Sequence, residues 1–273
     1  MIRAIQPLSP ATDLAVLRDA VLTAVVAGLV AATLLTVVQL TWITPLILQA
    51  ETYEEAAEHP ADAGAGAEHH HDAGADDHHH SGADDHHHSG AEHHHHDESA
   101  WKPQDGWQRS SFTWGANLLM GVGYGLVVVA AFLLWRAPRS TVWGVAYGIA
   151  GFAIFFAAPG LGLPPELPGT AAAELSTRQE WWVMTVAATA GGLVLFFSRV
   201  PVWVRVLAVV LIVAPHFIPA PHPAVEASLA PEALQDRFRL ATSVGNAVFW
   251  LSLGLTAAGL YRKFGLGSAH AHG

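Results

Sequence analysis

The sequence predicts an all-α polytopic integral membrane protein: one domain, residues 1–273, with six transmembrane helices. Hydrophobic residues make up 52% of the chain and charged residues only 13%, whereas a soluble domain carries about 25% charged residues. The apolar residues gather in segments long enough to cross a bilayer, which takes a helix of about 20 residues. Basic residues concentrate on the short segments between alternate spans, as expected for a membrane protein.

Six hydrophobic segments are the candidate spans. The first, second and sixth are strong, and the third and fourth are adequate. The fifth, VWVRVLAVVLIVAPHFI, is the weakest, and five spans remain without it. The segments cover residues 20–40, 115–135, 141–159, 181–198, 202–218 and 241–261.

The basic residues predict the orientation in the membrane. With six spans and both termini in the cytoplasm, eight of the 13 basic residues fall on short inner segments. The rest are spread over longer outer segments, which is the positive-inside pattern of a cytoplasmic (inner) membrane protein. The inner residues are Arg3, Arg18, Arg136, Arg139, Arg199, Arg205, Arg262 and Lys263, and the outer ones are Lys102, Arg109, Arg178, Arg237 and Arg239.

Glycines recur at four-residue spacing within two spans, as Gly121 with Gly125 and Gly144 with Gly148. Such pairs let membrane helices approach closely, which predicts a compact bundle. A composition rich in alanine and glycine explains part of the pattern as well.

A histidine- and aspartate-rich loop, residues 55–110, separates the first two spans and is predicted to lie outside the cell membrane. At its centre an eight-residue unit is repeated as AEHHHDAG, ADDHHHSG, ADDHHHSG and AEHHHHDE over residues 67–98. Gly, Ala, Ser and Asp fill the remainder and cannot build a hydrophobic core, so the loop is predicted to be disordered.

Imidazole and carboxylate groups are ligands of divalent transition metals, so this loop is predicted to capture metal at several exchangeable positions. Protonated imidazole cannot bind a metal, so the affinity should fall as the pH drops through about 6.5. A solvated linker or a pH-responsive tract is the alternative. The predicted ligands are His59, His69, His70, His71, His78, His79, His80, His86, His87, His88, His93, His94, His95 and His96.

Glu51 and Glu54 follow the first span and would share one helix face at i, i+3 spacing. They are predicted to pass a cation from the loop towards the membrane. A polar helix end explains the pair equally well.

His216 and His222 lie in the string APHFIPAPHP, whose three prolines interrupt helical hydrogen bonding. Irregular backbone at membrane depth is tolerated mainly where it is buried in protein or lines a cavity. These histidines are therefore predicted metal ligands at the outer mouth of a pathway; the alternative is a rigid loop with interfacial histidines. The nearby string GLGLPPELPG, residues 160–169, fits a packed cap or a structural turn.

Several classes of function are excluded. The chain has no cysteine, so a metal site must use nitrogen and oxygen ligands. Its two lysines, Lys102 and Lys263, do not stand in a phosphate-binding glycine loop, so no nucleotide site is expected. No basic patch suits nucleic acid, and no nucleophile stands beside a base, so an enzyme is not expected.

Four strings outside the histidine tract, in this order, resemble the CbtA family of predicted cobalt transporter subunits. They are QLTWITPLILQAETYE, GFAIFFAAPGLGLPPELPG with RQEWW, APHFIPAPHP and NAVFWLSLGLTAAGLYRK. The resemblance covers most of the chain outside the tract. It implies cobalt import for corrinoid synthesis together with CbtB, a small one-span, histidine-containing partner. The family is described with five spans and carries its histidine-rich motif on that partner, whereas here a long tract stands in the large subunit.

The residues leave several functions open. The first is import of a divalent metal, with cobalt expected and nickel or zinc as alternatives, since the ligand types suit all three. The second is a metal or pH sensor, or a metal store, without transport. The third is efflux, which an inverted orientation would favour. Lipid and a CbtB-like subunit are the expected partners, and a homo-oligomer is open.

Overall fold

The computed structural model describes residues 10–58, 104, 106–135, 138, 140–225, 227–264 and 266. The elements in this part are helices, with one isolated β-bridge between Thr170 and Ser228, so the predicted all-α fold is confirmed. In chain order they are α1 (Pro10–Val38), η1 (Gln39–Ile43), α2 (Thr44–Glu58), α3 (Trp107–Leu134), α4 (Trp143–Phe152), η3 (Ala153–Ala157), α5 (Ala158–Gly160), α6 (Leu175–Phe197), α7 (Val202–Val213), η4 (Ala214–Phe217) and α8 (Glu232–Lys263).

Five helical stretches of the described chain are long and apolar enough to cross a membrane. They correspond, to within two residues where they fall short, to the first four and the sixth of the predicted spans. The predicted fifth span forms a shorter apolar helix, Val202–Phe217. At 1.5 Å per residue its length is about 24 Å, less than the hydrocarbon thickness of about 30 Å. The qualifying stretches are Leu14–Ala57, Trp107–Leu134, Trp143–Gly160, Leu175–Phe197 and Glu232–Lys263.

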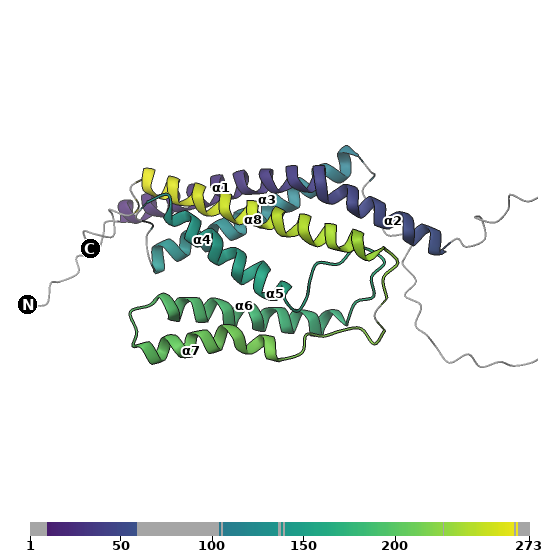
Figure 1. Ribbon diagram of the computed structural model, residues 1–273. Coiled ribbons are helices and arrows are strands. Elements are labelled where there is room, and N and C mark those ends of the chain that lie inside the picture. The colour runs from purple at the N-terminus through teal and green to yellow at the C-terminus, as the bar shows by residue number, and fades with distance from the viewer. Residues whose placement is uncertain are drawn as a thin grey trace, which may run out of the picture.

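The helices run alternately up and down, so α1 begins and α8 ends at the same end of the molecule (Figure 1). Helices α1, α3, α4 and α8 pack into one bundle, in which α1 contacts α3 and α8, and α4 contacts α8. Helices α6 and α7 form an antiparallel hairpin beside it (Figure 1). The hairpin meets the bundle where α6 contacts η3 and α5.

The helices extend further towards the histidine tract than the sequence predicted. Residues 55–58 belong to α2 and residues 107–110 to α3, although both were assigned to the loop at 55–110. Alanine and glutamate are good helix formers, so the EEAAE string continues the helix after the apolar segment has ended. Residues 59–103 lie outside the described residues.

Two π-helical turns each stand just before a proline. In η1 the Thr44 N–H bonds to the Gln39 carbonyl and Pro45 follows, and in η3 the Ala158 N–H bonds to the Ala153 carbonyl and Pro159 follows. A proline ring clashes with the carbonyl four residues earlier in an α-helix. A wider turn relieves this clash. The helix of the first span therefore continues through Pro45, whereas the helix of the third span ends shortly after Pro159.

Glycine pairs bring helix backbones into direct contact, as the four-residue spacing predicted. A methyl group on Gly121 would lie 2.6 Å from the carbonyl oxygen of Gly28, and one on Gly125 would lie 2.5 Å from that of Ala24. Gly144 meets the backbone of Gly254 in the same way, across the contact of α4 with α8. Close backbone packing of this kind is a main source of association between membrane helices.

Replacing Gly121 by alanine should destabilise the bundle, because its new methyl group would overlap the α1 backbone. Overpacking typically costs about 1–3 kcal/mol, so we expect a lower thermal unfolding midpoint in detergent. Gly123→Ala is the matched control, since a methyl group there meets nothing within 4 Å. Equal midpoints for the two variants would contradict the backbone contact.

Candidate metal-binding pocket

Two connections at the end of the molecule opposite the start of α1 are joined by backbone hydrogen bonds. Residues 161–174 link α5 to α6, and residues 218–231 link η4 to α8. The Ala171 N–H donates to the Ala227 carbonyl at 2.8 Å, and the Leu229 N–H donates to the Gly169 carbonyl at 3.1 Å. Gly169 has a φ of 73°, a left-handed conformation that favours glycine. The two connections therefore form one cap.

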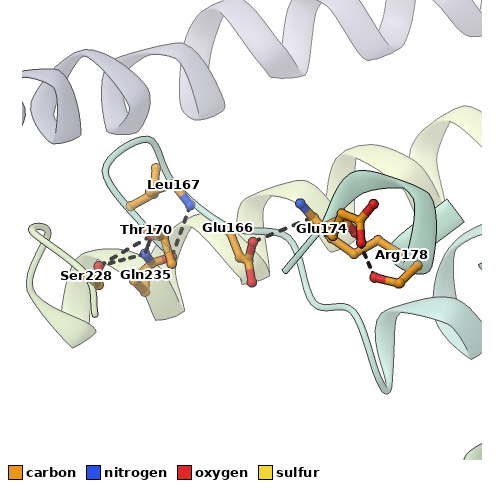
Figure 2. A network of polar contacts seen from close by, with 8 residues as sticks. Glu166, Leu167, Thr170, Glu174, Arg178, Ser228 and Gln235 are labelled. Carbon is orange, nitrogen blue, oxygen red and sulfur yellow. Dashed lines mark hydrogen bonds and ion pairs between the residues drawn. The ribbon is translucent and has the colours of Figure 1, made fainter. Parts of the chain in front are cut away.

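Gln235 at the start of α8 fastens this cap (Figure 2). Its amide oxygen accepts a hydrogen bond from the Leu167 N–H at 3.2 Å, and its amide nitrogen donates to the hydroxyls of Thr170 at 2.6 Å and Ser228 at 3.1 Å. The side chain is 5% exposed. The sequence analysis did not single out Gln235, because its partners lie on distant segments. The string at 160–169 is thus part of a packed cap.

Acidic side chains near the cap are engaged by arginine. Arg109 donates to Glu51 at 3.0 Å, and Arg178 lies 3.6 Å from Glu166, the pair drawn in Figure 2. Glu54 packs against the turn, since a methyl group on Gly169 would lie 2.9 Å from its Cγ. These ion pairs are about one-third exposed, and such pairs contribute roughly 0–1 kcal/mol. Glu51 is thus held by an arginine.

His216 and His222 line one pocket of about 770 Å³. Its walls come from η3 and α5 on one side and from α6, α7 and η4 on the other. These walls are mostly apolar, and their polar groups include the imidazoles of His216 and His222 and the hydroxyl of Thr189. His216 is half-buried and His222 is exposed. The two histidines thus share one cavity, which Glu51 and Glu54 do not line, and their role as metal ligands stays a prediction.

The ring of His216 is held on two sides. Its Nε2 lies 3.2 Å from the Ala158 carbonyl oxygen, and because a carbonyl can only accept, this hydrogen bond requires a proton on Nε2. The Trp181 ring meets it edge-on, with centroids 6.4 Å apart at 86°, while the Trp181 N–H donates to the Ile218 carbonyl at 3.3 Å. The lone pair of His216 Nδ1 is then left for a ligand, and metal-binding histidines commonly donate their other N–H to a carbonyl in this way.

A second pocket of about 610 Å³ lies on the other side of η3 and α5 and contains Glu166 and Arg178. Phe155, which lines this pocket, stacks on Trp250 with centroids 5.3 Å apart, and Tyr124 lies 4.9 Å from Phe155 and 4.8 Å from Trp250. These rings fill the space between α3, η3 and α8.

Within the described residues, no group of three or more His, Asp or Glu side chains could hold a metal ion. A cation in the first pocket would therefore complete its coordination with water or with groups outside the described residues. His59 and the histidines of residues 67–98 lie outside that part of the chain.

Comparison with known families matches residues 17–262 to the family described as "Probable cobalt transporter subunit (CbtA)". The matched range covers nearly the whole chain and includes both pocket histidines. Neither the curated proteins nor the solved structures give a match.

Replacing Gln235 by leucine should loosen the cap, because the Leu167 N–H would lose its acceptor in a buried place. An unsatisfied buried donor costs about 1–3 kcal/mol, so we expect a lower unfolding midpoint and faster protease cleavage within residues 161–174. Gln179→Leu, an exposed glutamine of α6, is the control. If the two variants were cleaved at the same rate, the fastening role would be wrong.

Proposed function

We propose that this chain, which belongs to the CbtA family of probable cobalt transporter subunits, imports a divalent transition metal across the cytoplasmic membrane. Cobalt is the expected ion because the family description names it. Nickel and zinc are the alternatives, since imidazole and carboxylate ligands accept all three. The observation that carries the proposal is the shared pocket of His216 and His222, with the His216 ring oriented to leave Nδ1 for a ligand.

The distribution of charge supports an orientation with the pocket outside. Arg18 stands near the start of α1, Arg199 follows α6, and Arg262 with Lys263 ends α8. All lie at the same end of the molecule, and short basic segments favour the cytoplasmic side. The cap, the pocket and the histidine tract would then face outwards, as a capturing surface for import requires.

In this proposal the tract of residues 67–98 captures metal at many exchangeable positions, and the pocket receives it. The membrane potential drives cations inwards by about 2.3 kcal/mol per charge per 100 mV, and twice that for a divalent ion. No nucleotide is needed for modest accumulation.

The word "subunit" in the family description implies a partner. We propose a small, one-span, histidine-containing membrane protein of the CbtB kind, which could complete the coordination that the described residues leave open. Its helix would meet this chain within the lipid. A homo-oligomer is the alternative assembly.

A sensor or metal store without transport is the second candidate function. Two observations favour it. Aromatic rings fill the interior below the second pocket, and among the described residues no acidic and histidine side chains gather into a complete metal site. Import and storage differ in where the metal ends up, which an uptake measurement distinguishes.

Uptake should depend differently on the two sets of histidines. With His216→Ala and His222→Ala combined, we expect chelator-resistant cobalt accumulation to be lost, because the pocket loses both imidazoles. Deleting residues 67–98 should only raise the external cobalt concentration needed for half-maximal uptake. The measurement is cell-associated cobalt, nickel and zinc after a chelator wash, with any one-span subunit encoded beside this chain co-expressed.

The matched control is the double variant His270→Ala and His272→Ala, which removes two histidines from the C-terminal tail and should leave uptake unchanged. Equal losses from the pocket variant and the tract deletion would refute the division of roles. Cobalt that the chelator strips from cells with the unaltered chain would favour the sensor or store.

Single cysteines can test the orientation cleanly, because the natural chain has none. Thr177→Cys, near the start of α6, should react with a membrane-impermeant maleimide in intact cells. Arg199→Cys, just after α6, should react only once the cells are permeabilised. Both side chains are exposed. The reverse labelling pattern would place the pocket inside and favour efflux.

A further inference from the structure

Thr189 in α6 is a buried hydroxyl without a hydrogen-bond partner, although the side chain is only 2% exposed. Thr185, one turn earlier on the same helix, shows what a buried threonine normally does: its hydroxyl donates to the Trp181 carbonyl at 2.9 Å. Thr189 makes no such bond. Buried polar groups are almost always paired, so an unpaired hydroxyl points to a missing partner.

Thr189 lines the same pocket as His216 and His222. Two contacts of α6 with the antiparallel α7 and the segment after it stand on either side of Thr189. A methyl group on Gly192 would meet Ile212 and the Ala208 carbonyl, and Trp181 bonds to the Ile218 carbonyl. Thr189 lies between these two contacts among the buried residues of α6.

The chemistry of the hydroxyl suits a water-mediated contact. A neutral threonine hydroxyl is not among the usual protein ligands of these metals, which in a chain without cysteine are imidazole and carboxylate groups. A water ligand between the ion and Thr189 could donate a hydrogen bond to the hydroxyl, which acts as both donor and acceptor. The pocket wall around Thr189 is apolar, with Leu193, Ile212 and Val213 as neighbours in the lining.

We propose that the Thr189 hydroxyl binds a water ligand of a divalent cation held by His216 and His222. This inference rests on the proposed function, since it requires metal at the two histidines. Thr189 is then a positioning residue of the pocket. It favours ions that keep several water ligands, such as Co²⁺, over Zn²⁺, which commonly settles with four ligands in all.

The test is cobalt(II) binding to the purified, full-length protein in which the histidines of residues 67–98 are replaced by serine, so that the tract does not mask the pocket. Thr189→Val removes the hydroxyl and keeps the shape. We expect about tenfold weaker cobalt binding, the lower end of effects at such outer positions, and an altered visible absorption spectrum of the bound cobalt. Zinc affinity should change less.

Two variants make the result specific. Thr189→Ser keeps the hydroxyl and should restore the affinity and spectrum of the parent protein. Thr185→Val removes a buried hydroxyl from the same helix that does not line the pocket, and should leave cobalt binding unchanged. Without metal, Thr189→Val should unfold at the same temperature as the parent or above it, because it removes an unpaired buried polar group.

The outcomes separate this inference from the proposed function. If the parent protein shows no cobalt binding that His216→Ala abolishes, the proposed metal pocket itself is wrong. If such binding exists and Thr189→Val matches the parent in affinity and spectrum, the role of Thr189 is wrong while the pocket stands. A loss in Thr185→Val as large as that in Thr189→Val would mean altered packing, and it would also overturn the inference.

Discussion

Backbone hydrogen bonding inside a bilayer is the constraint that shapes this molecule, because lipid tails offer no partners to an exposed N–H or carbonyl. Long helices satisfy the backbone hydrogen bonds over most of the described chain. Prolines interrupt this helical hydrogen bonding at defined places. Pro45 and Pro159 each follow a widened turn, and prolines again surround His216 and His222. Where the helices end between α5 and α6, and between η4 and α8, the two connections pair with each other and with Gln235. The irregular backbone of these connections is thus hydrogen-bonded to other protein groups.

The candidate site follows from this arrangement. The third span stops just after Pro159, and the short apolar helix Val202–Phe217 stops at Phe217, so both leave space beside α6 at the capped end. That space is the pocket, and the Ala158 carbonyl at its edge orients the His216 ring. A continuous helix at either place would fill the cavity. The proline interruptions therefore account for both the pocket and the orientation of the His216 ring.

Hydropathy alone located the helices, because segments that must be apolar over about 20 residues leave a strong signal. Hydropathy overestimated the fifth segment as a membrane span, because the proline-rich end of that segment shortens its helix. The residue type and the neighbouring prolines singled out His216 and His222, which the structure brings to one cavity, while their binding of metal stays a prediction. The contacts of Glu51 with Arg109 and of Gln235 with Leu167 were not predictable, since each joins residues far apart in sequence. Thr189 was equally hidden: threonine is common in such helices, and only the packed structure shows that its hydroxyl lacks a partner.

The packing of the helices is uneven, and this has a mechanical consequence. Helices α1, α3, α4 and α8 contain backbone-to-backbone contacts at Gly28, Gly125 and Gly254, and such contacts resist sliding because no side chain can yield. The α6–α7 hairpin meets the bundle at η3 and α5, and large apolar side chains such as Val206 at 59% exposure cover the outside of α7. The hairpin therefore joins the bundle along η3 and α5 and through the cap at Gln235. Because the pocket lies beside η3 and α5, a change at that contact would alter the pocket while leaving the glycine contacts intact.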